Sequence, residues 1–293
     1  MKVIKRCLGL LLAGWVMAAP APDLRPRLAL GLSLNVFPQI DIKDAQAAMA
    51  LCMSEAAGRA GFRSETTVYP SFRELQTDFQ KGRIDLAVLT PVEFFQIESS
   101  LQGEPAFTAS RDGRRTERYV VVAATDKPTA GLAGLKRRRL TYVRWDEPGL
   151  LFLNTLLLRA NQPEMDRFFG SAEPKERPSE AVHSVFFGAA DACVISEQAF
   201  QTMVELNPQV GRRLKVIAES PGLVRGMAVY GKAFPKESRD KILAASGRLN
   251  EYPRGKQILT LFQVDDFHPI LEEDLLETRR LFEEYRRRKG KLL

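Results

Sequence analysis

The stretch FQKGRIDLAVLTPVEFF, residues 79–95, decides the fold class. Gly82 can close a helix, because glycine readily takes the left-handed backbone found at helix ends. The run Ile84–Leu89 is short and mostly apolar, as expected of a buried strand. Pro91 then suits the first turn of a second helix. A helix, a strand and a helix in such quick succession indicate an α/β protein.

The same alternation of apolar runs and helical stretches continues on both sides of this unit. Upstream we expect two strands and one helix, at residues 28–34, 66–69 and 45–60. Ser71 and Glu74 have the spacing of a capping box, which predicts the start of the helix that runs through Phe79. Downstream we expect strands at 119–124, 140–143, 192–195, 214–217 and 224–230, and helices at 150–160, 179–187, 196–206, 238–249 and 271–285.

Breaks in this pattern divide the chain into two lobes. Lys127-Pro128 and Gly131 mark the expected crossover into a second lobe, and the run at 224–230 lies where the chain could return. We therefore expect a first lobe from residues 24–124 and 223–293, and a second lobe from 125–222. Two crossings between two lobes form a hinge, and strand ends that face each other across it form a ligand cleft.

The first residues have the pattern of a secretory signal peptide. Three basic residues precede an uncharged run from Cys7 to Ala19. That run is too short to anchor comfortably in a bilayer, which takes roughly 20 apolar residues. We expect cleavage after Ala18, so residues 1–18 are the predicted signal peptide and the mature protein is predicted to be periplasmic.

Composition and charge indicate a globular protein and do not favour one that binds nucleic acid. The chain has 45% hydrophobic and 27% charged residues, which is ordinary for a globular protein. Its net charge of +7 falls to +4 when the three basic residues of the leader are removed. Basic clusters at 111–115, 136–139 and 286–289 lack interleaved aromatic residues, so we interpret them as solvated faces or helix-end charges. We expect no nucleic-acid partner.

The cysteines of the mature chain are Cys52 and Cys193. They would permit one disulfide in an oxidising compartment. Both lie in apolar stretches that suit a small hydrophobic side chain. We therefore expect two free, buried thiols.

Motifs for catalysis and cofactors are incomplete. Residues 226–232, GMAVYGK, have the spacing of a phosphate-binding loop, but Ala233 stands where a Ser or Thr must reach magnesium. His183 falls in an apolar helical stretch. We interpret Asp265 and Asp266 as a loop and helix start, where acids favour the helix dipole, rather than as a metal or acid–base pair. The sequence thus predicts no enzyme, no metal and no cofactor, with an enzyme on the same fold as the less favoured alternative.

The stretch 69–96 resembles the phosphonate-, phosphite- and phosphate-type solute-binding proteins of ABC importers. In that family, Gly-x-x-Asp-hydrophobic-Ala leads into a strand and a ligand-facing turn with Pro. The matching residues here are Gly82, Asp85, Ala87 and Pro91. Two looser similarities follow at 179–191 and 214–221, so that the resemblance spans about residues 28–250.

The resemblance implies a fold and a function together. The fold is the type 2 periplasmic binding protein fold, in which two α/β lobes are joined by a two-crossover hinge with a ligand cleft between them. The function is capture of a small ligand in that cleft, without chemistry, for delivery to an ABC permease. A protein that reports its ligand to a membrane sensor is the alternative, and a monomer is expected in either case.

One turn departs from the family pattern. Members that bind phosphonate have a Ser/Thr-rich turn at the start of the second lobe's first helix, where hydroxyls and backbone N–H groups hold the oxyanion. Residues 144–149 read RWDEPG instead. An anion would meet Asp146 and Glu147 unless Arg144 compensates. The family's His near the next helix is also replaced, by residues 177–179. A cationic, zwitterionic or aromatic ligand therefore agrees with the sequence at least as well as a phosphonate does.

Candidate ligand-binding residues lie at strand ends and at the turns carried over from the family. They are Asn35, Tyr69, Phe72 and Thr90 in the first lobe, and Arg144, Trp145, Asp146, Ser196 and Glu197 in the second. Tyr69, Phe72 and Trp145 would offer ring faces, and Asn35 and Thr90 hydrogen bonds. Alternatives remain, because Phe72 would also suit a core position, Ser196 a helix N-cap and Arg144 a surface charge.

Overall fold

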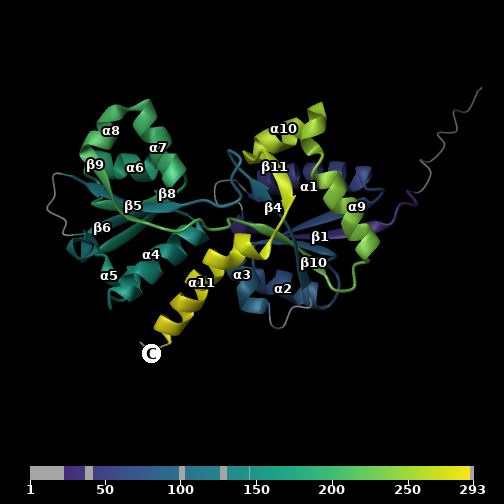
Figure 1. Cartoon of the computed structure of the whole chain (residues 1–293), viewed down its shortest axis with the longest axis horizontal. Helices are drawn as coiled ribbons and strands as arrows, with labels where there is room; N and C mark the ends of the chain where they lie inside the picture. The colour runs from purple at the N-terminus through teal and green to yellow at the C-terminus, as the bar shows by residue number, and fades with distance from the viewer. Residues whose placement is uncertain (1–22, 37–41, 99–102, 126–130, 145, 291–293) are drawn as a thin grey trace, which may run out of the picture.

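The computed structural model describes residues 23–36, 42–98, 103–125, 131–144 and 146–290. They form two α/β lobes that lie side by side along the long axis of the molecule (Figure 1). Neither the predicted signal peptide nor its cleavage position falls within the described residues. None of the helices in the described ranges is both long and apolar enough to span a membrane.

The first lobe is built on a six-stranded sheet with strand order β11-β4-β10-β3-β1-β2. The strands are β1 (Arg27–Ser33), β2 (Arg63–Tyr69), β3 (Leu86–Leu89), β4 (Gly103–Ser110), β10 (Met227–Gly231) and β11 (Asp266–Pro269). Its helices are α1 (Ile42–Arg59), α2 (Phe72–Gln80), α3 (Pro91–Ile97), α9 (Lys236–Ser246) and α10 (Pro253–Phe262). β1, β2 and β3 run parallel, so their carboxyl ends meet at one edge of the sheet.

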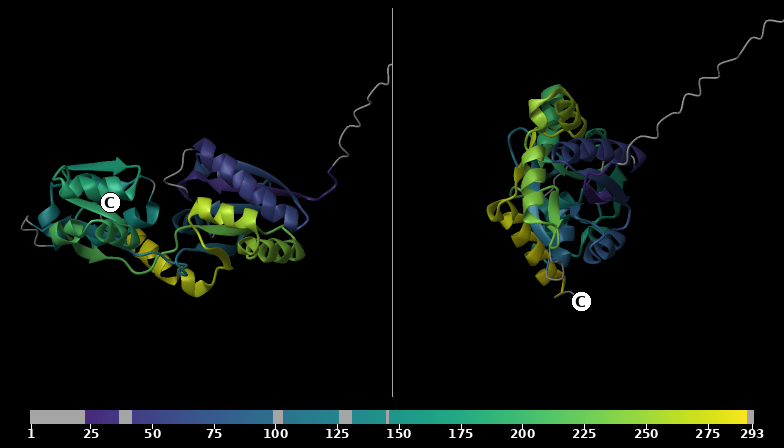
Figure 2. Two further views of the ribbon diagram at one scale, coloured as in Figure 1. Left: turned by 90° about the horizontal axis from the view of Figure 1, so that it is seen from above. Right: turned by 90° about the vertical axis from the view of Figure 1, so that its right-hand side faces the viewer.

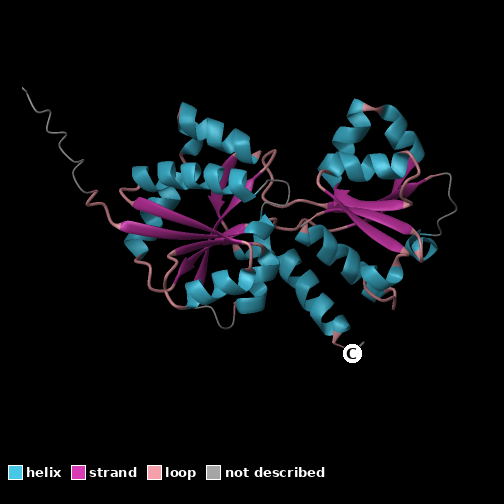
Figure 3. Ribbon diagram, turned by 180° about the vertical axis from the view of Figure 1, so that it is seen from behind, coloured by secondary structure: helices cyan, strands magenta, loops and turns pink. Residues whose placement is uncertain are grey.

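The second lobe is built on a five-stranded sheet with strand order β7-β6-β8-β5-β9. The strands are β5 (Tyr119–Ala124), β6 (Arg139–Val143), β7 (Ser171–Lys175), β8 (Ala192–Ser196) and β9 (Leu214–Glu219). The helices are α4 (Glu147–Arg159), α5 (Met165–Phe168), α6 (Pro178–Phe186), α7 (Glu197–Leu206) and α8 (Pro208–Arg213). Helices cover both faces of each sheet (Figure 3).

Two expectations about the lobes need correction. The crossover was expected after Ala124, but β5 pairs with β8 and β9 and belongs to the second sheet. All six of its residues are buried, and a uniformly apolar strand of this kind does not reveal which sheet will take it. The crossings are therefore residues 111–118 and 220–226. The final helix α11 (Glu272–Lys289), expected in the first lobe, reaches from that lobe to pack on α4 of the second (Figure 2).

The expected capping box was also misplaced. Ser71 is the N-cap of α2, but its side chain makes no capping hydrogen bond. The capping box lies instead at the start of α3, where Thr90 and Glu93 satisfy each other's backbone N–H groups. Gly61 and Gly82 end helices in the left-handed conformation, as expected.

The apolar core joins the lobes on one face and leaves them separate on the other. On the face of α3, α4 and α11, one buried cluster runs through both lobes and includes Phe94, Tyr119, Phe152 and Phe282. On the opposite face, the cluster around Leu30 and Tyr230 belongs to the first lobe. A third cluster, which contains Cys193 and Phe200, belongs to the second lobe.

Candidate functional site

A cavity of about 500 Å³ lies where the two lobes and both crossings meet. The first lobe contributes residues of β4, β10 and β11 and the inner sides of α1, α9 and α10. The second lobe contributes the first turn of α7. A volume of this size suits a small organic ligand.

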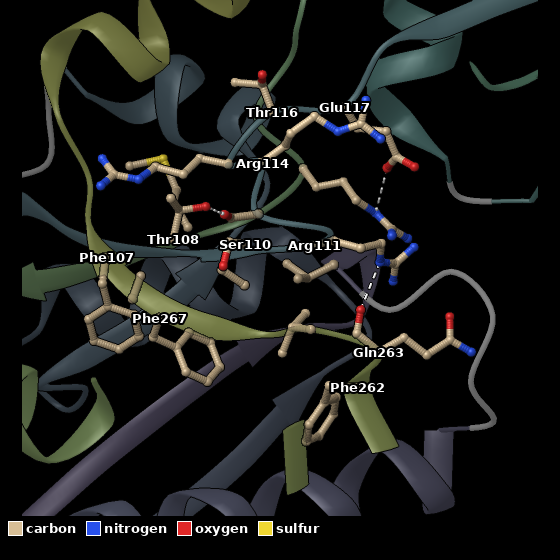
Figure 4. A pocket seen from close by; sticks show the side chains of 18 of the residues that line it. Phe107, Thr108, Ser110, Arg111, Arg114, Thr116, Glu117, Phe262, Gln263 and Phe267 are labelled. Carbon is tan, nitrogen blue, oxygen red and sulfur yellow. Dashed lines mark hydrogen bonds and ion pairs between the residues drawn. The ribbon is translucent and has the colours of Figure 1, made fainter. Parts of the chain in front are cut away.

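A tight hairpin at the end of β4 forms part of the cavity wall (Figure 4). Arg111 and Arg114 exchange backbone hydrogen bonds of 2.9 and 3.0 Å across it. Asp112 and Gly113 occupy its two central positions with φ of 48° and 70°. Positive φ at both positions is the reason that Asp-Gly favours a two-residue hairpin turn. The turn places two arginines opposite each other beside the cavity.

The hairpin contacts both lobes. The Gly113 N–H donates to Asp265 at 2.9 Å, and Arg111 Nε donates to the carbonyl of Gln263 at 2.7 Å, both in the first lobe. From the second lobe, the Gln198 side chain at the start of α7 donates to the carboxylate of Asp112. Movement of one lobe relative to the other would therefore act on this turn.

The charges along the cavity are unevenly paired. Arg225 lies 3.5 Å from Glu117, Arg115 lies 3.3 Å from Asp274, and Arg118 lies 3.0 Å from Glu219. Arg111 and Arg114 form no ion pair with any carboxylate in the described part of the chain. Burial and then the neighbouring Arg225 lower the pKa of Arg111. A partly buried guanidinium beside another cation is a site that an anion would stabilise.

A second polar contact joins the lobes at the starts of α3 and α4. Glu93 is 2% exposed and accepts hydrogen bonds from Ser33 Oγ at 2.6 Å, Asn35 Nδ2 at 2.8 Å and the Thr90 N–H at 2.9 Å. The Thr90 hydroxyl donates across the interface to Glu147 of α4. Burial raises the pKa of Glu93, and burial raises that of Glu147 to about 7. We call these residues the carboxyl contact.

The predicted site residues separate into groups. Asn35 and Thr90 belong to the carboxyl contact. Glu197 lines the cavity and lies 4.0 Å from Arg118. Ser196 caps α7 by accepting the Ala199 N–H at 3.3 Å, so the N-cap alternative describes its observed contact.

Asp146 lies near the crossings. Burial raises its pKa to about 6, and Arg225 opposes that shift. Arg144 does not compensate for it, because Arg144 Nε donates instead to Glu176 at 2.7 Å. The positive charge that balances Asp146 therefore comes from the second crossing rather than from the same turn.

The aromatic candidates lie elsewhere. The Tyr69 hydroxyl donates to Asp78 at 2.9 Å, and Phe72 begins α2 and packs against the shared apolar cluster. Neither side chain lines the cavity. Trp145 lies outside the described residues. A ligand contact of these three residues stays a prediction.

Sequence reasoning missed the residues that make up the cavity's charge. Arg111 and Arg114 were grouped with solvated basic runs, although Asp112-Gly113 between them is a strong hairpin signal. No local signal identifies Arg225 and Glu117, because they come from different crossings that only the fold brings together. Cys193 is a free, buried thiol, whereas the side chain of Cys52 lies outside the description. Within the described ranges, no group of three or more His, Cys, Asp or Glu residues is placed to hold a metal ion.

The family model of the ABC transporter phosphonate periplasmic substrate-binding proteins matches residues 35–275. No curated protein matches the sequence. Among solved structures, a chloride-bound protein from Xanthomonas citri is similar at 15% identity and a TM-score of 0.68, over 90% of this chain and 99% of that one.

Two further structures are similar. A binding protein component of an ABC phosphonate transporter from Pseudomonas aeruginosa has 14% identity and a TM-score of 0.65, over 90% of this chain and 88% of that one. PhnD1 from Prochlorococcus marinus, in complex with methylphosphonate, has 17% identity and a TM-score of 0.64, over 89% and 98%. Identities this low support a shared fold of two lobes.

Proposed function

Because the chain belongs to the phosphonate-type family of periplasmic substrate-binding proteins of ABC transporters, we propose that it captures its ligand in the cavity between its lobes. Proteins of this family bind small molecules and work with ABC permeases. The bound form of this chain would then be the form presented to a permease.

The observation that carries the proposal is the position of the cavity. Its wall includes residues of both crossings, 111–118 and 220–226, together with Glu197 and Gln198 of the second lobe. A hinge movement must therefore change the shape of the cavity, and a ligand held there would favour one relative position of the lobes. A cavity within one lobe would not have this property.

The predicted site residues enter the proposal in different ways. Glu197 would meet the ligand directly, since it lines the cavity. Asn35 and Thr90 would stabilise the junction of the lobes through the carboxyl contact, and Asp146 would act on the ligand through its influence on Arg225. We propose further that residues 1–18 are removed on export and that the mature protein is a monomer without catalytic activity. N-terminal sequencing and light scattering of the exported protein check the first two points.

The experiment that tests capture starts with protein purified without denaturation. Acid release followed by mass spectrometry identifies any small molecule that was carried along, and that molecule is then added back to the stripped protein. We expect thermal stabilisation, because a ligand at about 100 times its Kd adds about 2.7 kcal/mol to the free energy of unfolding. Small-angle scattering should show a more compact particle.

A pair of substitutions locates the effect. Ala109→Trp places an indole in the cavity wall and should abolish stabilisation by the added molecule. Ala189→Trp, at an exposed position of the second lobe, is the matched control and should keep it. If the Ala109 variant folds and still responds like the wild type, the ligand binds elsewhere and the proposal is wrong.

A further inference from the structure

We infer that Arg111 of the hairpin, rather than the start of α4, binds the anionic group of the ligand, and that the apolar side of the cavity holds the rest of the molecule. This inference rests on the proposed function, since it names the residue that would recognise the ligand in the same cavity. It is carried by the arrangement of charge and apolar surface around the cavity (Figure 4).

Positive charge predominates on the cavity wall. Five arginines and two glutamates line it: Arg111, Arg114, Arg115, Arg118, Arg225, Glu117 and Glu197. Arg115, Arg118 and Arg225 each lie near a carboxylate, so their charge is largely balanced. Arg111 instead has the neutral carbonyl of Gln263 as its hydrogen-bond partner. The planar guanidinium keeps further N–H groups that can donate to a carboxylate, sulfonate or phosphonate.

The other side of the cavity is apolar. Phe107 and Phe267 lie together on one side in Figure 4, away from Arg111 and Glu117. Phe262 also lines the cavity and lies beside Gln263. Phe107 and Phe267 pack edge to face with centroids 5.7 Å apart. Met227 and Val264 add further apolar surface to the cavity wall. A fully hydrated inorganic anion would leave these side chains without a partner, whereas an apolar body would cover them.

The start of α4 does not compete for the anion. A helix N-terminus is favourable for negative charge, but here Asp146 and Glu147 occupy that position. Glu147 already accepts the hydroxyl of Thr90, and Asp146 lies under the influence of Arg225. An anion at this turn would meet two carboxyl groups, so the hairpin is the more favourable place.

Two fluorescent probes with the same ring system test the inference. Anilinonaphthalene sulfonate carries a negative charge, and phenylnaphthylamine is its neutral counterpart. Titration of the stripped wild-type protein should show at least about tenfold tighter binding of the sulfonate, because hydrogen bonds to charged groups contribute that much. Arg111→Gln should remove this preference and leave the affinity for the neutral probe within about twofold of wild type.

Arg118→Gln is the matched control. Arg118 also lines the cavity, but Glu219 and Glu197 balance its charge, so the preference for the sulfonate should persist. If Arg111→Gln does not fold, Arg111→Lys serves instead. It should keep a reduced preference that weakens with added salt.

The outcomes separate this inference from the proposed function. Equal binding of both probes to the wild type, or an unchanged preference in Arg111→Gln, overturns the anion assignment. If Ala109→Trp then still abolishes binding of the neutral probe, the cavity remains the site of capture. Wild-type protein that binds neither probe overturns the anion assignment, and the proposed function also fails if no released molecule stabilises it.

Discussion

The two faces of the molecule join the lobes in different ways. On the face of α3, α4 and α11, a single apolar cluster continues from one lobe into the other. Ion pairs from α11 add to it, since Arg279 pairs with Glu98 beside α3 and Glu284 pairs with Arg159 of α4. On the opposite face, two separate clusters belong to one lobe each, and the hairpin 111–114 bridges the lobes beside the cavity.

The polar groups on the two faces differ in whether they already have all their hydrogen-bond partners. At the carboxyl contact, Glu93 accepts three hydrogen bonds and is almost fully buried. At the hairpin, Arg111 is half-buried, and its hydrogen-bond partner is a neutral carbonyl rather than an anion. The first contact is complete without a ligand, and the second is not. We therefore expect the first to determine stability and the second to determine binding.

The largest effect should come from Glu93→Ala. The substitution leaves the buried donors of Ser33, Asn35 and Thr90 without their acceptor and removes half of the capping box. We expect a loss of about 3 kcal/mol in the free energy of unfolding, measured by urea denaturation. Binding of anilinonaphthalene sulfonate by the folded fraction should not change.

Arg118→Gln is the comparison on the other side. Its ion pairs are largely exposed, so we expect less than about 1 kcal/mol of destabilisation. Equal losses for Glu93→Ala and Arg118→Gln would contradict the division of roles between the two contacts.

Much of the fold could be predicted from the sequence, because each element depends on local signals. The run 79–95 gave a helix end at Gly82, a strand, and a helix with Pro91 in its first turn, and all three are present. The sheet that takes β5 could not be predicted, since six buried residues look alike in either lobe. Pairing partners depend on contacts far apart in the chain, which local patterns do not encode.

The site was harder to predict than the fold. Asn35 and Thr90 follow strand ends, and the structure brings both to Glu93. The sequence left open whether Arg144 compensates for its neighbour Asp146, whereas Arg225 opposes that charge from a distant crossing. Sequence proximity is a poor guide to ion pairs wherever a chain crosses twice between lobes.

The second-largest expected effect is the pH dependence of the free energy of unfolding, which arises at the carboxyl contact. Burial raises the pKa of Glu147 from 4.5 to about 7, so the folded state holds this proton more tightly than the unfolded chain. The stabilisation is present below the unfolded pKa and is lost as pH rises through the folded pKa. Between about pH 5 and about pH 8 we expect a loss of about 1 to 3 kcal/mol, allowing for partial exposure.

Urea denaturation at the two pH values checks this expectation. Glu147→Gln has no proton to lose and should show a smaller decrease, with a remainder from Asp146, whose pKa is raised to about 6 in the same direction. Glu284→Gln is the matched control. Arg159 lowers the pKa of Glu284 to about 2, so its stabilisation is lost only below its usual pKa of 4.5. A Glu147 variant with the full wild-type decrease would show that another group carries it.

The smallest effect should come from Gly113→Ala and should fall on binding. Among the described residues other than its two chain neighbours, no atom lies within 4 Å of the position that a Cβ would take, so the cost is the φ of 70° alone. Alanine in the left-handed region costs about 1 kcal/mol, which shifts the hairpin toward conformations that do not present Arg111. We expect sulfonate affinity to fall by up to about fivefold in fluorescence titration, with binding of the neutral probe preserved. Gly113→Asn should lose less, because asparagine tolerates positive φ. If Gly113→Ala instead weakens the binding of both probes equally, the hairpin shapes the whole cavity rather than orienting one cation. The hairpin would then not be a contact specific to anion recognition, and its contrast with the carboxyl contact would be wrong.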